Sequence, residues 1–498
     1  MPERKRVAVL ADSDTRWKWG ALTARRLVPD HQLTGFLLRG RATPTARQLG
    51  EVGVRADRLT EVTCAEFLAE VEREHYDVVV LALVGGAVQA VLHGARALWP
   101  TPARRPVLVT GYVGVVYEKL ADGLLLRHGA DLVLANSRHD AQRFRAVYEG
   151  VGADAGAVTE TALPFLGGAP YTPAGSRAHT VVFAVQPSVP DSRADRTYLL
   201  ERAAGHARRH PGREVLIKLR SKPGEHTTHL EEQPYQRLAE RIPGGLPPNC
   251  RLVYGNMSEV LDGTDLLVTV SSTAALESLH RGVPTAVLTD LGIREALGNH
   301  HFLGSGCLAS WDQLDSGLLP EGDPVWLAAH GVLPAPDPGA VPGPAARAAG
   351  SPAASRASAA DGAAVPESAA AAHGTAAGPA PVRDSAARTS AAPAAGEDTA
   401  HDPYAVARAR VAGLLAAARL PAPAPYYTAT TAPRYLPGIL ARHHLAPDGT
   451  PLPGAVRATA GESRLRRRLR GHLRDAARGA YRHGVQRVAP VIRRLGEL

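Results

Sequence analysis

The chain has 498 residues, of which 45% are hydrophobic and 21% charged, so it can form two or three globular domains and is not a fibrous or wholly disordered protein. Its three cysteines, Cys64, Cys250 and Cys307, lie far apart without a C-x-x-C pair, which excludes a zinc ribbon and a disulfide scaffold. The sequence contains no signal-peptide core and no apolar run long enough to span a bilayer, and we therefore expect a cytoplasmic protein.

The net charge of +9 comes from one terminal segment. Residues 463–498 contain eleven arginines and two acidic residues, so the remainder of the chain is neutral. A charge excess confined to one end indicates a basic appendage and argues against a phosphate-binding groove across the fold. We therefore expect no nucleic-acid partner.

From Arg6 to about Gly168, short runs rich in β-branched residues alternate with helix-like stretches, which predicts a parallel sheet with right-handed crossovers. The predicted buried strands are Val7 to Ala11, Leu33 to Leu38, Asp77 to Leu83, Val107 to Thr110 and Leu132 to Ala135, and an amphipathic helix is predicted from Cys64 to His75. Residues 1–168 are expected to form a Rossmann-like domain.

A Gly/Pro/Ser hinge, Gly167 to Ser176, precedes a second succession of the same kind, which predicts another Rossmann-like domain at residues 177–333. Its predicted strands are Thr180 to Val185, Glu214 to Leu219, Arg251 to Tyr254, Leu266 to Val270 and Thr285 to Thr289, with helices from Asp195 to Arg209 and from about Thr273. Open α/β sheets bind ligands at the carboxyl ends of their strands, so two such domains in tandem predict a cleft between these ends.

Residues 334–401 are predicted to be a disordered linker. Ala, Pro, Gly and Ser make up 50 of the 67 residues from Pro334 to Ala400, so this segment cannot bury enough apolar surface to offset the entropy of ordering it. After it, a helix is predicted at residues 402–417 and a second at residues 463–498.

The first candidate site lies where the strand Leu266 to Val270 ends in Ser271, Ser272 and Thr273. Free backbone N–H groups at a helix start attract anions, and a diphosphate would fit there. The alternative is that these hydroxyls only cap the helix that follows, which carries Glu277.

The second candidate site follows the strand Glu214 to Leu219 and contains Lys218, Arg220 and Lys222. Only five of the 57 basic residues are lysines, so arginine has replaced lysine almost everywhere and a retained lysine is informative. Two lysines at the end of a strand suggest phosphate neutralisation or stabilisation of a leaving group. The alternative is a solvated loop on which two lysines occur by chance.

A third candidate site follows the first strand, where Asp12 and Asp14 precede Trp17, Lys18 and Trp19. We predict that one of the carboxylates is a general base toward an acceptor hydroxyl, and that Lys18 and the two tryptophans bind the acceptor, with an indole as the stacking face. The alternative is that the segment caps and packs the next helix.

Several common sites are not indicated by the sequence. It contains no G-x-G-x-x-G after a strand, no Walker loop and no G-x-S-x-G elbow, which argues against dehydrogenases, P-loop kinases and α/β-hydrolases. The adjacent His300 and His301 lack a third ligand, and Asp-x-Asp is too short to indicate a metal site. We expect neither a metal nor a cofactor.

The segment Asp265 to Pro284 resembles the donor half of bacterial GT-B-type glycosyltransferases and, more distantly, glycerophosphotransferases and sialyltransferase-like capsule enzymes. Supporting segments are Lys218 to His229, Asp12 to Gly20 and Ala130 to Ser137. The resemblance implies an α/β fold of two Rossmann-like domains facing a cleft, with the acceptor on the first domain, a nucleotide-activated donor on the second, and a return helix from Asp402.

By this resemblance, Ser/Thr-rich turns hold phosphate and a glutamate near the helix start contacts sugar or ribose. The implied activity is transfer of a sugar from a nucleotide-sugar donor to an envelope or secondary-metabolite acceptor, a glycan or a lipid-linked molecule. The alternatives are transfer of a polyol phosphate and a non-catalytic membrane-surface adaptor that kept the fold, since fold alone does not establish function.

The segment 463–498 predicts a basic amphipathic helix, because apolar residues recur every three or four positions while arginines fill the rest. We predict that this helix lies on an anionic membrane surface, which would place the protein at the inner face of the cell membrane. The alternatives are a helix packed on its own body and a nucleic-acid-binding helix.

Overall fold

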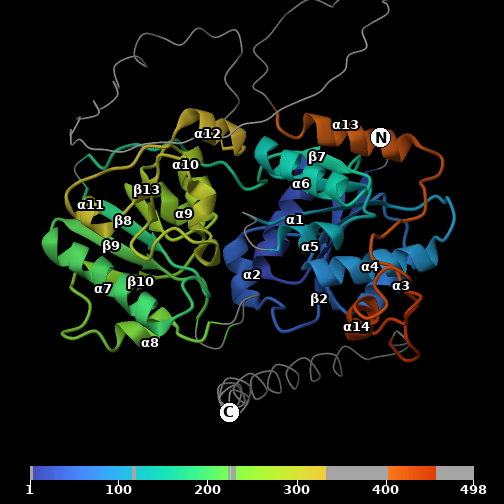
Figure 1. The fold of residues 1–498 in the computed structure, drawn as a ribbon, viewed down its shortest axis with the longest axis horizontal. Coiled ribbons are helices and arrows are strands. Elements are labelled where there is room, and N and C mark those ends of the chain that lie inside the picture. Colours follow the sequence, from blue (N-terminus) through green and yellow to red (C-terminus); the bar gives the residue numbers. More distant parts are fainter. Residues whose placement is uncertain are drawn as a thin grey trace, which may run out of the picture. The chain divides into compact units, whose positions relative to one another are not determined.

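The structure is a computed structural model that describes residues 4–114, 119–175, 177–222, 225, 231–332 and 402–455. The predicted linker at 334–401 and the predicted basic helix at 463–498 lie outside the described residues. The described residues form two α/β domains, each built on one parallel sheet, which confirms the predicted fold class (Figure 1). None of the helices in these ranges is long and apolar enough to cross a membrane.

The first domain is built on a seven-stranded parallel sheet with the order β3-β2-β1-β4-β5-β6-β7. The strands are β1 (Lys5–Ala11), β2 (His31–Leu38), β3 (Arg58–Val62), β4 (Val78–Ala82), β5 (Val107–Gly111), β6 (Leu132–Ala135) and β7 (Val158–Glu160). Every residue of β4 is buried, because helices cover both faces of a parallel sheet and its central strands therefore have no solvated side.

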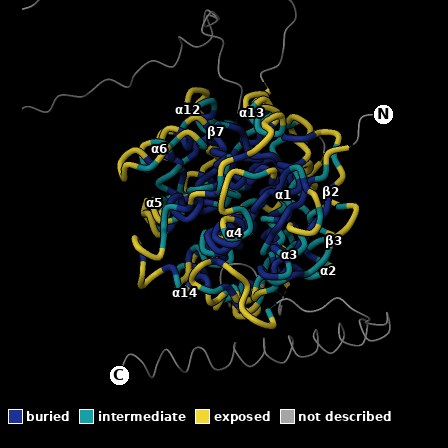
Figure 2. The backbone as a smooth tube through the Cα atoms, turned by 90° about the vertical axis from the view of Figure 1, so that its right-hand side faces the viewer, coloured by how far each residue is buried: buried dark blue, intermediate teal, exposed yellow. Residues whose placement is uncertain are grey.

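The helices of the first domain are α1 (Asp14–Leu27), α2 (Ala46–Val52), α3 (Cys64–Arg73), α4 (Gly85–Leu98), α5 (Leu120–Leu125) and α6 (Arg138–Gly150). Capping side chains fix where several of them begin: Ser13 accepts from the N–H of Arg16 at the start of α1, and Thr63 forms a capping box with Glu66 at the start of α3. Figure 2 shows α4 as largely buried among the surrounding elements.

The second domain is built on a six-stranded parallel sheet with the order β10-β9-β8-β11-β12-β13. The strands are β8 (His179–Ala184), β9 (Arg213–Lys218), β10 (Cys250–Val253), β11 (Leu266–Thr269), β12 (Thr285–Leu288) and β13 (Leu308–Ala309). The helices are α7 (Arg193–Arg209), α8 (Tyr235–Ala239), α9 (Met257–Asp262), α10 (Ala274–His280), η1 (Glu295–Leu297), η2 (Asn299–Phe302), α11 (Trp311–Asp315) and α12 (Pro324–Ala329).

The two sheets share one strand order. In each, the first strand of the domain lies between the second and the fourth, so the order reverses at β1 and at β8. A crevice opens at such a reversal beyond the carboxyl ends of the strands, and open α/β sheets bind their ligands there. The segments that follow β1 and β8 are therefore the places to look for a site.

After the second domain, the chain returns to the first (Figure 1). Helix α13 (Ala405–Ala416) buries Ala407 and Val411 in the same core cluster as Trp17, and the Tyr404 hydroxyl donates to the carbonyl of Ala162 at 2.7 Å. Helix α14 (Leu436–Arg442), in a stretch without a sequence signal, packs against α4. The first domain is therefore assembled from two separate parts of the chain.

Candidate active site

A cavity of about 870 Å³ lies between residues from the carboxyl ends of the two sheets. The first domain contributes Asp14, Thr15 and Lys18 from the start of α1, and the second contributes the ends of β8, β9 and β11. Both strand-order reversals thus open into one space, whose volume is typical of small-molecule sites.

Most of the predicted donor residues line this cavity. They are Lys218, Arg220, Ser271, Ser272, Thr273 and Glu277. Lys222 does not line the cavity. Its ammonium nitrogen lies 5.6 Å from the centre of the Tyr254 ring, with which it makes a cation–π contact.

Lys218 is a buried cation at the end of β9. The residue is 6% exposed, and its ammonium donates to the carbonyl of Leu219 at 2.6 Å. Burial lowers its pKa to about 8, because desolvation disfavours the charged form. Three of the five lysines in the chain, Lys18, Lys119 and Lys218, line the cavity, although arginine outnumbers lysine about tenfold in the sequence.

In the turn from Ser271 to Thr273, several of the N–H groups that the sequence predicted to be free have acceptors within the protein. The N–H of Ser271 donates to Gln186, that of Ser272 donates to Thr269, and that of Ala274 donates to the Ser272 hydroxyl oxygen. The Ser271 hydroxyl donates to the carbonyl of Leu297 at 2.6 Å. The N–H groups of Ser271, Ser272 and Ala274 therefore have acceptors in the protein, and the same cavity is also lined by the cationic side chains of Lys218 and Arg220.

Glu277 lies in α10 with its side chain 9% exposed, and its carboxylate is 3.7 Å from the Lys18 ammonium of the first domain. Burial raises the pKa of Glu277, and the charges of Lys18 and Arg281 oppose this effect. The Lys18 ammonium also lies 5.0 Å from the centre of the Phe165 ring. Predicted acceptor-side and donor-side residues therefore meet across the cavity.

Asp14 is the predicted catalytic carboxylate that reaches the cavity. Its Oδ1 accepts from the Arg220 guanidinium at 2.7 Å. Burial acts to raise the pKa of Asp14, but the charge of Arg220 and the hydrogen bonds from Arg220 and Thr15 outweigh it, so the pKa lies below its ordinary value.

Three residues that the sequence assigned to the site, Asp12, Trp17 and Trp19, do not reach the cavity. Asp12 does not line the cavity: its carboxylate pairs with Arg16 at 2.9 Å and accepts from the N–H of Val84 at 2.8 Å. Trp17 and Trp19 are 0% and 1% exposed and belong to the core cluster of the first domain, so neither offers a stacking face to an acceptor. The two residues are two positions apart on α1 and therefore point to different sides of the helix, and both sides are covered by the first domain.

Some cavity residues were missed by the sequence reasoning. Gln186 follows β8 and holds the Ser271 turn through its side-chain oxygen, a position that the carboxyl end of the predicted strand Thr180 to Val185 could have indicated. Lys119, just before α5, has a left-handed backbone with φ of 53°, and the rarity of lysine was its signal. Glu51 and Arg294 carried no signal in the sequence.

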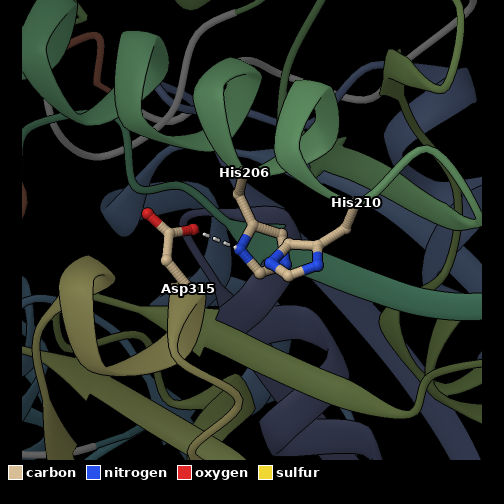
Figure 3. Close-up of side chains that lie close together, drawn as sticks. All are labelled: His206, His210 and Asp315. Atoms are coloured by element: carbon tan, nitrogen blue, oxygen red, sulfur yellow. Dashed lines mark hydrogen bonds and ion pairs between the residues drawn. The ribbon is translucent and has the colours of Figure 1, made fainter.

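A second cluster of titratable groups lies at the far end of α7, where His206, His210 and Asp315 come within 4.8 Å of one another (Figure 3). His206 Nδ1 lies 2.7 Å from Asp315 Oδ1, and burial lowers the pKa of His206 to about 4, so this ring is neutral at pH 7 and donates to the carboxylate. Arg213 lies 3.2 Å from the other nitrogen of the same ring.

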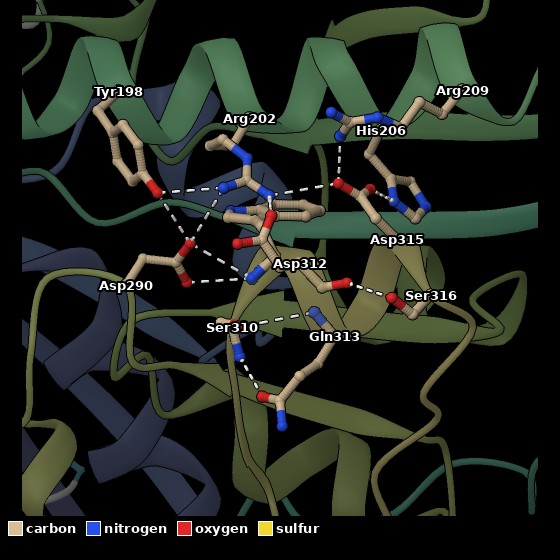
Figure 4. A network of polar contacts seen from close by, with 11 residues as sticks. Tyr198, Arg202, His206, Arg209, Asp290, Ser310, Asp312, Gln313, Asp315 and Ser316 are labelled. Carbon is tan, nitrogen blue, oxygen red and sulfur yellow. Dashed lines mark hydrogen bonds and ion pairs between the residues drawn. The ribbon is translucent and has the colours of Figure 1, made fainter.

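Figure 4 shows that this cluster belongs to a larger polar network between α7 and α11. Asp315 also accepts from Arg202 at 3.2 Å and pairs with Arg209. The Asp315 carboxylate is therefore neutralised by guanidinium groups, and a divalent cation placed there would face those of Arg202, Arg209 and Arg213. The arrangement fits a clamp between two helices better than a metal centre.

Two Rossmann-like domains, each with a parallel sheet, and a cavity between their strand ends are the architecture of GT-B-type enzymes. The sequence profile of the family described as "Putative glycosyltransferase (DUF6716)" matches residues 7–342, which is more than half of the chain. The chain belongs to this family and is an enzyme of the GT-B type. No curated protein matches its sequence significantly.

Many solved structures match the chain at low similarity. A UDP-N-acetylglucosamine 2-epimerase from Rickettsia bellii is 11% identical with a TM-score of 0.45, and the match covers 64% of this chain and 89% of that one. A UDP-glucosyltransferase from Polygonum tinctorium is 13% identical with a TM-score of 0.40, over 62% and 85% of the two chains. Phytolacca americana UGT2 is 14% identical with a TM-score of 0.40, over 66% and 93%.

Proposed function

We propose that this enzyme transfers a sugar from a nucleotide-activated donor to an acceptor hydroxyl. The observation that carries the proposal is the meeting, in one cavity, of a carboxylate from the first domain, Asp14, with Lys218 and Arg220 from the second. This is the charge distribution that the reaction needs, because the acceptor loses a proton while the departing nucleoside diphosphate gains negative charge.

The proposed step is a substitution at the anomeric carbon of the donor sugar. The acceptor oxygen attacks the anomeric carbon, the bond from that carbon to the diphosphate oxygen breaks, and the acceptor proton passes to the Asp14 carboxylate. Lys218 and Arg220 stabilise the charge on the leaving diphosphate, with the Ser272 and Thr273 hydroxyls beside them. Glu277 faces the sugar or ribose, and Lys18 lies on the acceptor side.

The acceptor proposed is an envelope or secondary-metabolite glycan or a lipid-linked molecule. The basic segment 463–498 would bring the enzyme to an anionic membrane surface, because each arginine near such a surface contributes about 1 kcal/mol. Removal of all residues after Glu462 should then abolish binding to phosphatidylserine vesicles while leaving nucleotide binding intact. Vesicle binding that persists in the truncated chain would contradict this localisation.

The proposed activity is tested by nucleotide binding followed by donor hydrolysis. Thermal shifts with UDP, dTDP, GDP, ADP, CDP and CMP identify the base, and the corresponding nucleotide-sugars and CDP-glycerol then identify the transferred group. Lys218→Ala should weaken binding roughly tenfold or more, since losing a hydrogen bond to a charged group costs about 1.5–3 kcal/mol. Lys5→Ala, an exposed lysine outside the cavity, is the matched control. A wild-type protein that binds none of these nucleotides would favour the non-catalytic adaptor.

A further inference from the structure

Ion pairs join the first domain to the second, and two of the three pairs within the described ranges line the cavity. Among the described residues they are Asp14 with Arg220, Lys18 with Glu277, and Arg47 with Glu225. In each pair the first residue belongs to α1 or α2 of the first domain and the second to the second domain. The structure therefore shows donor-side charges that are already matched by protein side chains.

The Asp14–Arg220 pair joins the candidate base to a candidate phosphate ligand. The Nη2 atom of Arg220 donates to Asp14 Oδ1 at 2.7 Å and also to the Thr15 hydroxyl. The guanidinium is planar and binds a phosphate and a carboxylate through the same fork of N–H groups. A donor diphosphate held at Lys218, two residues earlier, would compete with Asp14 for this fork.

Arg220 keeps the Asp14 carboxylate ionised and its pKa low. The Asp14 side chain is only 13% exposed, so its carboxylate is mostly shielded from water. Desolvation is the largest effect on its pKa and acts upward, whereas the charge and the hydrogen bond of Arg220 act downward. If Arg220 turns away, desolvation raises the pKa of Asp14 without the opposing charge of Arg220, and the carboxylate becomes a stronger base.

We propose that Arg220 exchanges Asp14 for the diphosphate of the donor, so that donor binding releases the base for the acceptor. This inference rests on the proposed function and adds a regulation to it. Without donor, the carboxylate is engaged and weakly basic; with donor, the same guanidinium neutralises phosphate and Asp14 faces the acceptor. The enzyme should therefore bind donor before it deprotonates acceptor.

Other charges around Asp14 define the necessary controls. They are Arg16 and Lys18 on α1, Asp12 at the end of β1, Lys218 on β9 and Glu277 on α10. Lys218, with a pKa of about 8, stays protonated at acid pH whether or not donor is bound. Burial raises the pKa of Glu277, so this residue needs a variant of its own.

The first test measures the affinity for UDP-, dTDP-, GDP- and ADP-glucose by calorimetry. Asp14→Asn removes the competing charge, so the nucleotide-sugar that binds the wild type should bind this variant about fivefold tighter, the effect expected for loss of one partly exposed ion pair. Asp12→Asn is the matched control, because Asp12 pairs with Arg16 outside the cavity, and its affinity should equal that of the wild type.

The second test measures protons taken up on binding, from calorimetry in two buffers of different ionisation enthalpy. At about pH 5 the wild type should take up a fraction of a proton per site, because the pKa of Asp14 rises when Arg220 leaves it. Asp14→Asn should show a smaller uptake, and Glu277→Gln should retain the Asp14 contribution.

The outcomes separate this inference from the proposed function. A wild type that binds none of the four nucleotide-sugars and none of UDP, dTDP, GDP, ADP, CDP and CMP contradicts both. Binding by the wild type with affinity that is equal or weaker in Asp14→Asn, and with the same proton uptake in both proteins, overturns the exchange at Arg220 and leaves the proposed function standing. Tighter binding together with reduced uptake in Asp14→Asn supports the exchange.

Discussion

Replacing Lys218 by methionine should make the protein more stable and nucleotide binding weaker. The Lys218 ammonium is buried at the end of β9, and burial holds its pKa at about 8 instead of 10.5. At 1.36 kcal/mol per pH unit, this difference corresponds to a penalty of about 3 kcal/mol for keeping the charge in the folded protein. Methionine keeps an unbranched apolar side chain of similar length and carries no charge.

One loss offsets part of this gain. The carbonyl of Leu219 accepts from the ammonium at 2.6 Å, and losing that hydrogen bond costs about 1 kcal/mol. Lys218→Met should therefore raise the free energy of unfolding by about 2 kcal/mol at pH 7. The folded chain binds fewer protons than the unfolded chain between pH 8 and 10.5, so wild-type stability rises over this range and the advantage of the variant shrinks.

Urea denaturation at pH 7 and at pH 10 measures both effects, with Lys5→Met as the control for an exposed lysine. A Lys218→Met protein less stable than the wild type at pH 7 would refute the reasoning, because it would mean that the protein compensates the buried charge. A stabilised variant that no longer binds nucleotide would identify Lys218 as a residue retained for function at the expense of stability.

Nucleotide affinity, measured by calorimetric titration, should fall about tenfold between pH 7 and pH 9, because Lys218 is protonated below its pKa of about 8 and neutral above it. Lys218→Arg should remove this pH dependence, because a guanidinium stays charged throughout this range. Trp17→Ala should destabilise the protein by about 3–5 kcal/mol in urea denaturation, as expected for a fully buried indole and not for an exposed acceptor contact. The free energy of unfolding should decrease as the pH falls from 6.5 to about 4, because burial lowers the pKa of His206 and His330 to about 4 and of His301 to about 3, whereas the same histidines in the unfolded chain take up protons near pH 6.5. The urea midpoint should therefore be lower at pH 5 than at pH 7, and equal midpoints would contradict this prediction.

The sheets were predictable because their strands are continuous apolar runs, and the strands predicted from Val7 to Ala11 and from Leu266 to Val270 coincide with β1 and β11 to within a residue or two. Strand β3 was missed because Arg58–Val62 has little apolar content, and β7 because it has only three residues. The sequence placed Asp14 and Lys218 at strand ends, where they line the cavity.

What the sequence left undecided depends on side-chain direction. A strand-to-helix turn predicts polar groups at a sheet edge, but the hydrogen bonds of Gln186 come from a different strand, and they decide whether the Ser271 N–H is available. In the same way, the sequence alone does not tell which side chains of α1 reach the cavity. The position of the sheet beneath the helix decides this, since it buries both Trp17 and Trp19 and leaves Asp14 at the cavity.

The return of the chain to the first domain has a practical consequence for dividing the protein into parts. Residues 1–168 alone would lack Tyr404, Val411 and Leu436, which complete two of the core clusters of that domain, and would leave apolar surface on α4 exposed to water. An expression boundary placed after the second domain would therefore remove part of the first. A separately folding first domain requires residues 402–455 joined to residues 1–168, and a deletion series from the carboxyl end should unfold the first domain before it reaches the second.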